Sequence, residues 1–342
     1  MREISALTIN AWSGLNYRGV WRMGCHETAA RREERYRALV AEIMARRPDV
    51  IAVNEANPLP GYARRLAGDT GYACIWHMGV SGIRLGRIGI PVNLREGDMI
   101  LAKPGLSLRM LGRRKLYGPG FVSNGASIHT GDLTQVLLGS IAVSGERINI
   151  AATHLHLAMP HNAASLLSMG EMCGRQRYSR RAIEEAFVRL QREHEARMKE
   201  CDRLIRWLRS SVPPESPLLL MGDFNAEPDS LLMRKILDAG FHDAFRAAEN
   251  TPGHTWDAEN NSHIRRYYVP RVQEPHEDLY RHALEGYELK SRRIDYILCN
   301  GLISESSVLG CGLCLNSEEY GVQPSDHFGV FEIGRASCRE RV

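Results

Sequence analysis

The sequence has no long apolar run, no internal repeat and no low-complexity linker. Its apolar runs are only a few residues long, as in Pro217–Met221, whereas a membrane span needs roughly 20 residues. We therefore expect no membrane-spanning helix. Neither sign of charge dominates, because 44 Lys and Arg face 40 Asp and Glu, so charge alone makes no case for nucleic acid. With 44% hydrophobic and 25% charged residues, the composition is that of an ordinary globular protein.

Cysteine is scattered and does not suggest a framework of disulfides or a zinc site. Cys311 and Cys314 form the only C-x-x-C pair, with no second pair or neighbouring histidines to complete a metal site. We expect free thiols in a reducing compartment. Met1 leads almost directly into a strand-like run without a signal-peptide pattern, which indicates a cytoplasmic protein.

The last nine residues, Gly334–Val342, read GRASCRERV and resemble a translated sequencing adapter. We therefore expect a single domain over residues 1–333, with residues 334–342 as a tail outside the fold. We also expect a monomer.

Short strand-like runs dominate the domain and alternate with helical patterns. Several runs are continuously apolar, which favours strands that are covered on both faces. The expected strands are Ile4–Asn10, Asp49–Asn54, Tyr72–His77, Asp98–Ala102, Gln135–Val143, Arg147–His154, Pro217–Met221, Ile294–Cys299 and His327–Ile333. Apolar residues at helical spacing predict helices over Glu27–Arg47 and Arg181–Arg209. The second helix would be roughly 40 Å long and could overhang the domain.

Two further segments have no clear strand or helix assignment. The glycine-rich stretch Gly79–Gly97 lacks the G-K-[ST] of a phosphate-binding loop, and we interpret it as an irregular loop. Residues 158–180 form an inserted segment that follows His154 and His156 and contains several methionines. It is either a flap packed on the following helix or a wall that shapes the substrate cleft.

Polar residues recur at the ends of the predicted strands. Carboxylates, amides and imidazoles at strand ends are what a layered β core can direct to one edge. Carboxylate ligands with room for water and phosphate suit Mg²⁺ better than zinc. The candidates are Asn10, Glu55, His154, Asp223, Asn225, Asp295, Asp326 and His327.

Taken in order, these residues belong to a recognisable set of motifs. The blocks are Leu7–Asn10, Pro48–Glu55, Thr153–Leu155, Gly222–Asn225, Arg293–Tyr296 and Ser325–His327. This ordered set resembles the endonuclease/exonuclease/phosphatase superfamily over nearly the whole chain. The resemblance implies an α/β fold, a four-layer α/β/β/α sandwich of two packed mixed β-sheets flanked by helices. It also implies a Mg²⁺-dependent phosphodiesterase, with Mn²⁺ as the alternative ion.

The resemblance also assigns roles to individual residues. Glu55 would be the main metal ligand, with Asn10 and Asp326 near the ion. His327 would act as the general base or its electrostatic equivalent, oriented by Asp295. Asp223 would position the attacking water, and Asn225 and His154 would hold phosphate oxygens. Asn54 stands where the family usually carries Gln, and we expect no loss of a ligand from this departure.

The substrate class stays open at this point. Thr153–His156 and Asn10–Trp12 resemble the corresponding blocks of neutral sphingomyelinases, which favours a phospholipid head group or a small phosphodiester. The alternative is a nuclease acting on DNA or RNA, for which Ile264–Tyr268 and Arg271 are the best candidate basic and aromatic stretch. A third hypothesis, an inactive binding module, would require the loss of Glu55, Asp223 or His327, and all three are present.

Overall fold

The structure is a computed structural model that describes residues 2–175, 178–249, 251–268, 277–300, 302–303 and 305–336. Its described helices are α1 (Ala29–Arg46), α2 (Gly61–Thr70), α3 (Ala163–Arg175), α4 (Arg180–Ser211), α5 (Leu231–Asp238), α6 (Ala244–Ala248), α7 (Ser262–Tyr267) and α9 (Leu279–Glu288), with a 3₁₀ turn at Glu305–Ser307. None of these helices is long and apolar enough to cross a membrane. The cysteines in the described ranges carry free thiols.

The first sheet has the strand order β15-β16-β1-β2-β6-β3. Strands β1 and β2 pair in parallel and the other neighbours are antiparallel, so the sheet is mixed. The strand bounds are β1 (Arg2–Asn10), β2 (Val50–Ala56), β3 (Ala73–Val80), β6 (Glu96–Ala102), β15 (Val308–Cys314) and β16 (Gly329–Ala336).

The second sheet has the order β13-β14-β12-β11-β10-β7 and is also mixed, because β11 and β12 pair in parallel. Its other neighbours are antiparallel. The strand bounds are β7 (Arg109–Tyr117), β10 (Thr134–Val143), β11 (Glu146–His154), β12 (Leu218–Asp223), β13 (Phe241–Asp243) and β14 (Asp295–Asn300).

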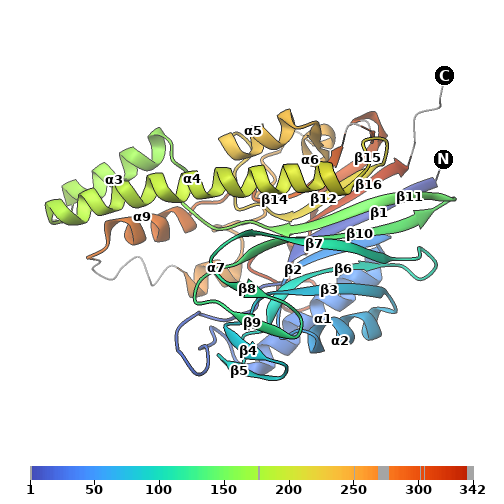
Figure 1. Ribbon diagram of the computed structural model, residues 1–342, viewed down its shortest axis with the longest axis horizontal. Helices are drawn as coiled ribbons and strands as arrows, with labels where there is room; N and C mark the ends of the chain where they lie inside the picture. Colours follow the sequence, from blue (N-terminus) through green and yellow to red (C-terminus); the bar gives the residue numbers. More distant parts are fainter. Residues whose placement is uncertain are drawn as a thin grey trace.

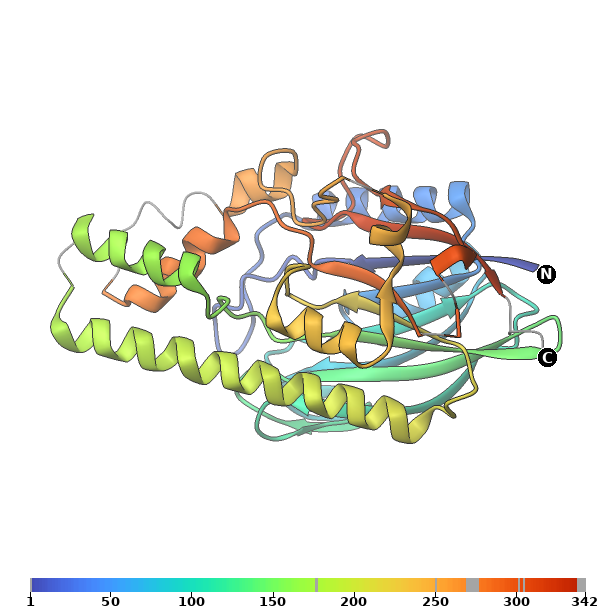
Figure 2. The same cartoon turned by 90° about the horizontal axis from the view of Figure 1, so that it is seen from above.

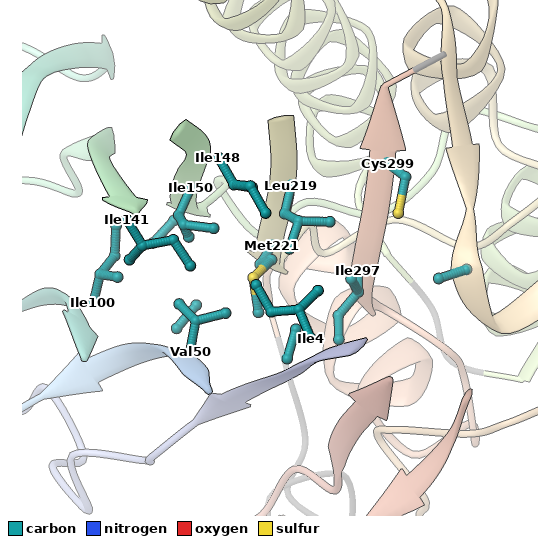
Figure 3. Packing of buried hydrophobic residues seen from close by; sticks show 14 of the residues in the cluster. Ile4, Val50, Ile100, Ile141, Ile148, Ile150, Leu219, Met221, Ile297 and Cys299 are labelled. Carbon is teal, nitrogen blue, oxygen red and sulfur yellow. The ribbon is translucent and has the colours of Figure 1, made fainter. Parts of the chain in front are cut away.

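The two sheets pack face to face over an apolar core (Figure 3). Alternate residues of each strand point into this core, as strand geometry requires. Ile4 and Ala6 of β1 face Leu219 and Met221 of β12 and Ile297 of β14 across the interface. The intervening residues of each strand point outward, toward the helices.

Helices cover both outer faces (Figure 1). Tyr36, Leu39 and Ile43 of α1 pack on the outer face of the first sheet together with α2. Leu204 and Leu208 of α4 pack on the outer face of the second sheet together with α5. The expected four-layer α/β/β/α sandwich of two mixed sheets is therefore confirmed.

The long helix α4 extends beyond the sheets at one end of the molecule (Figure 2). There α3 and α9 pack on it, around a separate apolar cluster that includes Met169, Leu190 and Tyr280. The segment that follows His156 is therefore in contact with the long helix, as the flap interpretation expects.

The expectation of an irregular loop over Gly79–Gly97 is wrong in part. This stretch contains the hairpin β4 (Ile83–Leu85) and β5 (Ile88–Ile90), which joins β8 (Phe121–Val122) and β9 (Ala126–Ile128) in a small third sheet of order β5-β4-β9-β8. Gly86 turns the hairpin at φ +57°, a conformation that glycine adopts without strain. Because each strand has only three residues or fewer, sequence periodicity cannot reveal them.

The last strand reaches into the expected tail. Strand β16 ends at Ala336, and Gly334, Arg335 and Ala336 pair with Ile4, Glu3 and Arg2 of β1. Backbone pairing does not depend on side-chain type, so a chain that leaves β16 in extended form continues along β1. Residues 337–342 lie outside the described residues.

Candidate active site

The inward-facing residues of several strands change from apolar to polar at one end of the sandwich. In β1 the inward positions run from Ile4 and Ala6 to Asn10, and in β12 from Leu219 and Met221 to Asp223. Strands β11, β14 and β6 follow the same pattern at His154, Asp295 and Asp98. The period of two that builds the core therefore also gathers these side chains at one rim.

A bulge in β2 turns Glu55 toward this rim. The register of β2 against β6 shifts between Val53 and Ala56, and Glu55 has a φ of +54°. Val53 and Ala56 both pack on the helix side, so the extra residue lets Asn54 and Glu55 leave that face. Bulges commonly redirect side chains beside active sites, and Glu55 is held in a backbone conformation that non-glycine residues adopt at a cost.

Asn10 links the two sheets at the site. Its Nδ2 donates to Glu55 Oε1 at 2.9 Å and to Asp223 Oδ2 at 3.2 Å. Its Oδ1 accepts the Trp12 backbone N–H at 3.0 Å. The predicted ligand Asn10 thus presents its nitrogen to the carboxylates, while its oxygen is held by the backbone.

Asp223, Asn225 and His154 form a compact group on the second sheet. The Asn225 backbone N–H donates to Asp223 Oδ1 at 2.8 Å. The Asn225 amide lies 3.2 Å from His154 Nε2, which is 3.5 Å from Asp223 Oδ2. Burial raises the pKa of Asp223, and the Asp295 charge raises it further. Burial lowers the pKa of His154, but Asp223 and Glu55 outweigh that effect and raise it.

Gly222 is required for this arrangement. It adopts a φ of +136°, and a Cβ at this position would collide with the Thr153 carbonyl oxygen. The close approach of β11 and β12 at this point brings His154 beside Asp223, with which it is paired in register. The glycine of the Gly222–Asn225 motif is thus explained by backbone packing.

His327 and Asp295 form a buried hydrogen-bonded dyad. His327 Nδ1 lies 2.8 Å from Asp295 Oδ2, and His327 Nε2 lies 3.8 Å from Asp223 Oδ2. Trp256 packs edge-on against the imidazole, with ring centroids 5.1 Å apart. Burial lowers the pKa of His327, but the charges of Asp295 and Asp223 raise it to about 10. The dyad fixes the ring and leaves Nε2 directed to the reaction space.

A tyrosine and a serine hydroxyl border Asp326. Tyr268 donates to its Oδ2 at 2.9 Å, while the Ser325 hydroxyl lies 3.2 Å from its Oδ1 and donates to the Asn10 carbonyl at 2.6 Å. Burial raises the pKa of Asp326 to about 6, against the lowering effect of His327 and with a further raising effect of Glu55. Tyr268 places the basic and aromatic stretch Ile264–Tyr268 at the border of the site, while Arg271 lies outside the described residues.

Asn54 has a structural role that the sequence did not reveal. Its Nδ2 donates to Asp98 Oδ1 at 2.7 Å, and its Oδ1 accepts the Asp223 backbone N–H at 3.1 Å. It therefore ties β2 both to β6 and to β12 in the opposite sheet. The expectation that the departure at Asn54 removes no ligand is compatible with this bridging role.

Two further carboxylates, Glu96 and Asp98, were also missed. Both are buried at the start of β6. Tyr17 donates to Glu96 at 2.6 Å, and burial together with the charge of Glu55 raises the pKa of Glu96 to about 8. Their spacing by two residues ahead of an apolar strand was the available signal, since it places both on the inward face.

All eight predicted residues meet at this rim, and six of them line a cavity of about 400 Å³. The other two, Asn10 and Asp295, contact members of that lining directly. The described residues of the inserted segment, 158–175 and 178–180, do not line this cavity, whose wall ends at Leu157 on that side. This favours the flap interpretation of the segment over the wall interpretation.

The charge of the rim suits a hard divalent cation. Glu55, Glu96, Asp98 and Asp326 gather around the cavity, and burial raises the pKa of the last three. Burial disfavours the ionised form of these carboxylates, and a cation beside them would favour it. Ligand atoms of Asp223, Asp295 and His327 also lie within 4.8 Å of one another, but the hydrogen bond between Asp295 and His327 marks that pair as a dyad. An oxygen donor set of this kind fits Mg²⁺ or Mn²⁺.

Comparison with known proteins agrees with this fold. Solved structures cover nearly all of the chain at low identity: an endonuclease/exonuclease/phosphatase family protein from Leptotrichia buccalis C-1013-b has a TM-score of 0.56 at 17% identity, covering 96% of this chain and 98% of that one. The endonuclease/exonuclease/phosphatase from Bacteroides vulgatus has a TM-score of 0.60 at 13% identity, covering 98% and 100%. TDP2 from D. rerio, in complex with a single-strand DNA product, has a TM-score of 0.55 at 14% identity, covering 98% and 99%.

No curated protein matches the sequence. The model of the Endonuclease/Exonuclease/phosphatase family, by contrast, matches residues 7–327. This range contains all eight site residues and all of the second sheet, and it omits only the start of β1 and the strand β16 of the first sheet. The chain therefore belongs to the Endonuclease/Exonuclease/phosphatase family and has its phosphoesterase and nuclease fold.

Proposed function

We propose that the protein is a Mg²⁺-dependent phosphodiesterase that directs a water molecule at a phosphodiester bound at this rim. The observation that carries the proposal is the double hydrogen bond of Asn10 to Glu55 and Asp223. It joins the carboxylate that would hold the ion, on the first sheet, to the carboxylate that would orient the water, on the second. The two halves of the site are therefore fixed relative to each other before substrate binds.

The chain's own residues supply proton handling and phosphate contacts. His327, oriented by Asp295, directs Nε2 toward Asp223. As an imidazolium it would support the Asp223 carboxylate, which would orient the water and accept its proton. His154 and the Asn225 amide lie side by side and would donate to non-bridging phosphate oxygens as charge develops there. Both groups are already held in place by the protein, so little reorganisation is needed.

Glu55 and Asp326 would hold the ion, and Asn10 would orient Glu55 beside it. When bound, Mg²⁺ supplies positive charge to the phosphate oxygens and favours ionised water. Mn²⁺, with the same preference for oxygen ligands, is the alternative ion. An inactive binding module is not supported, because every residue of the predicted set is present and assembled.

For the substrate, we favour a phospholipid head group or a related small phosphodiester. A cavity of about 400 Å³ is of the size that holds small ligands, and the local resemblance at Thr153–His156 points the same way. The alternative is a nuclease. It is supported by the similarity in fold to TDP2, which was solved with a single-strand DNA product. Parallel assays with a phospholipid, a small diester and DNA distinguish a phosphodiesterase for lipids or small diesters from a nuclease.

Removal of the metal ligand tests the reaction itself. Glu55→Gln keeps the shape of the side chain but removes its charge, so we expect kcat on bis-p-nitrophenyl phosphate to fall by about 10²-fold or more. EDTA should abolish turnover by the unmodified protein, and Mg²⁺ should restore it. The circular dichroism spectrum should stay unchanged. Full activity in EDTA, or of Glu55→Gln, would disprove the metal-dependent mechanism.

A further inference from the structure

Two hairpin tips expose apolar side chains beside the active-site cavity. One tip carries Val20 and Trp21, and the other, the β4–β5 hairpin and the residues after it, carries Leu85, Ile88 and Val92. We call these five residues the docking surface. Trp21, Leu85 and Ile88 are 74%, 77% and 84% exposed, although burying such side chains is normally favourable. Grouped apolar exposure of this kind marks an interaction site.

The two tips are held together as one surface. The Val92 backbone N–H donates to the Trp21 carbonyl at 2.9 Å. Asn93 accepts the Met23 N–H at 2.8 Å and donates to the Met23 carbonyl at 2.9 Å. The N-terminal loop and the β4–β5 hairpin lie side by side at the same edge of the molecule (Figure 1).

The docking surface is continuous with the active-site cavity. Leu15, Asn16 and Tyr17, at the base of the first tip, line the cavity. Gly79 and Val80, which lead into the second tip, line it as well. A ligand whose phosphate lies in the cavity therefore extends toward apolar side chains on this side.

The charged residues carried by the two tips are of one sign. Residues 11–26, 79–95 and 99–131 contain no Asp or Glu. Arg18, Arg22 and Arg87 lie exposed within the tips themselves. Apolar tips whose own charged residues are all arginines match the interface of a membrane that contains anionic lipids, where apolar side chains insert and arginines meet phosphate.

The same features disfavour other occupants. In a symmetric contact with a second copy, the arginines of the two tips would face each other and repel. Single-stranded nucleic acid binds through successive aromatic platforms, whereas Trp21 is the one aromatic residue among these five and the four aliphatic side chains cannot stack with bases.

We propose that the docking surface binds the protein to anionic phospholipid membranes and places the active-site cavity over a lipid head group. This inference rests on the proposed phosphodiesterase function and narrows its substrate class to phosphodiesters carried by a membrane. Insertion of the tips would orient the cavity toward the bilayer, so the apolar tails would stay in the membrane while the phosphate enters the site.

Vesicle flotation tests the docking surface without reference to catalysis. The unmodified protein should float with vesicles of phosphatidylserine and phosphatidylcholine, and much less with phosphatidylcholine alone or in high salt. Leu85→Ser/Ile88→Ser should lower the partition coefficient by about tenfold or more, since two aliphatic side chains no longer insert. Leu231→Ser is the matched control, because Leu231 is a half-exposed apolar residue on α5, away from the tips.

Hydrolysis of bis-p-nitrophenyl phosphate by the same proteins measures the proposed function separately. A double variant that loses vesicle binding but still hydrolyses this diester supports the docking role. Equal flotation of the double variant and the Leu231→Ser control would overturn it. The docking role would also be overturned if the unmodified protein did not bind vesicles. The same holds if the double substitution changed only self-association or the binding of single-stranded DNA. Failure of the unmodified protein to hydrolyse bis-p-nitrophenyl phosphate would instead contradict the proposed phosphodiesterase function.

Discussion

Arg35 shows how a single buried side chain holds two loops of the site. From α1 its guanidinium donates to the Ala11 and Pro324 carbonyls at 3.2 and 2.6 Å, and to Glu27 through two nitrogens. Ala11 directly follows Asn10, and Pro324 directly precedes the Ser325–His327 turn. The planar fork of arginine can satisfy these acceptors together, and a lysine ammonium cannot.

We therefore expect Arg35→Lys to affect both stability and catalysis. Loss of several buried hydrogen bonds should lower the free energy of unfolding by about 1–3 kcal/mol. It should also lower kcat about tenfold, because the two loops that carry Asn10 and His327 lose their common anchor. Urea unfolding and initial rates measure the two effects. Arg65→Lys, whose two bonds to Glu33 lie at the surface, is the control and should change stability by less than about 1 kcal/mol. Equal effects of the two substitutions would contradict the anchoring role.

His156 illustrates a residue whose role became clear only in the structure. It lies 3.0 Å from Glu193 Oε2 and 3.5 Å from Asp132 Oδ2, and its ring stacks on Tyr117. Burial lowers the pKa of His156, but the carboxylates of Asp132 and Glu193 outweigh burial and raise it from 6.5 to about 9. The folded state therefore favours the charged imidazolium at the rim.

This raised pKa predicts a pH-dependent stability. Because the pKa of His156 in the folded state exceeds its ordinary value, the charged imidazolium stabilises the folded state fully below pH 6.5. This stabilisation is lost as the pH rises through about 9. We expect His156→Gln to lose on the order of 2–3 kcal/mol near pH 6 and much less above pH 9. Urea unfolding at both pH values measures the difference. His161→Gln, whose ring faces His194 and not a carboxylate, is the control. If His156→Gln lowered the free energy of unfolding equally at both pH values, a stabilising role of the charged imidazolium would be ruled out.

At the scale of elements, apolar patterning predicted the strands that build the core. Each of the nine expected strands is present, because strands covered on both faces must be apolar nearly throughout. Strand β7 was not predicted, because Arg109–Tyr117 carries four cations at the edge of its sheet. An edge strand exposed to water has no apolar pattern to reveal it, and charge there protects against association.

The site was predicted from motifs, but its supporting residues were not. Glu55 was identified at a strand end, whereas the bulge that turns it to the rim leaves no mark in apolar periodicity. Asn54 looked like a minor departure, although it bridges both sheets. Such contacts join residues far apart in sequence, between Asn54 and Asp223 for example, and only the packing of the two sheets defines them.

The helix α3 provides a prediction about the inserted segment. Met169 is fully buried against α4 and α9, and the described residues of the segment do not line the active-site cavity. Replacing Asn162–Gly174 with a Gly-Ser linker should therefore lower the melting temperature, since burial of Met169 alone is worth about 1.5–3 kcal/mol. The rates of hydrolysis of all substrates should fall together. A changed ratio of kcat/KM between bis-p-nitrophenyl phosphate and a phospholipid would restore a specificity role for this segment.

At the scale of the whole molecule, the sandwich concentrates buried negative charge where its two sheets meet. The first sheet contributes Glu55, Glu96 and Asp98, and the second contributes Asp223 and Asp295. Burial raises the pKa of Glu96, Asp98 and Asp223, so their ionisation opposes folding. The site therefore reduces the stability of the ion-free protein, and the packing of the two sheets must offset this cost.

A divalent cation that binds the native rim should consequently stabilise the whole fold. Because the unfolded chain has no assembled site, Mg²⁺ at about 100 times its Kd should add about 2.7 kcal/mol, which raises the melting temperature by several degrees. Calorimetry in Mg²⁺ and in EDTA measures this shift without any substrate. Glu55→Gln should reduce the shift, while Glu33→Gln, at the surface of α1, should leave it unchanged. Equal melting temperatures of the unmodified protein in Mg²⁺ and EDTA would show that the rim does not bind the ion, and the same shift in both variants would place the ion away from Glu55.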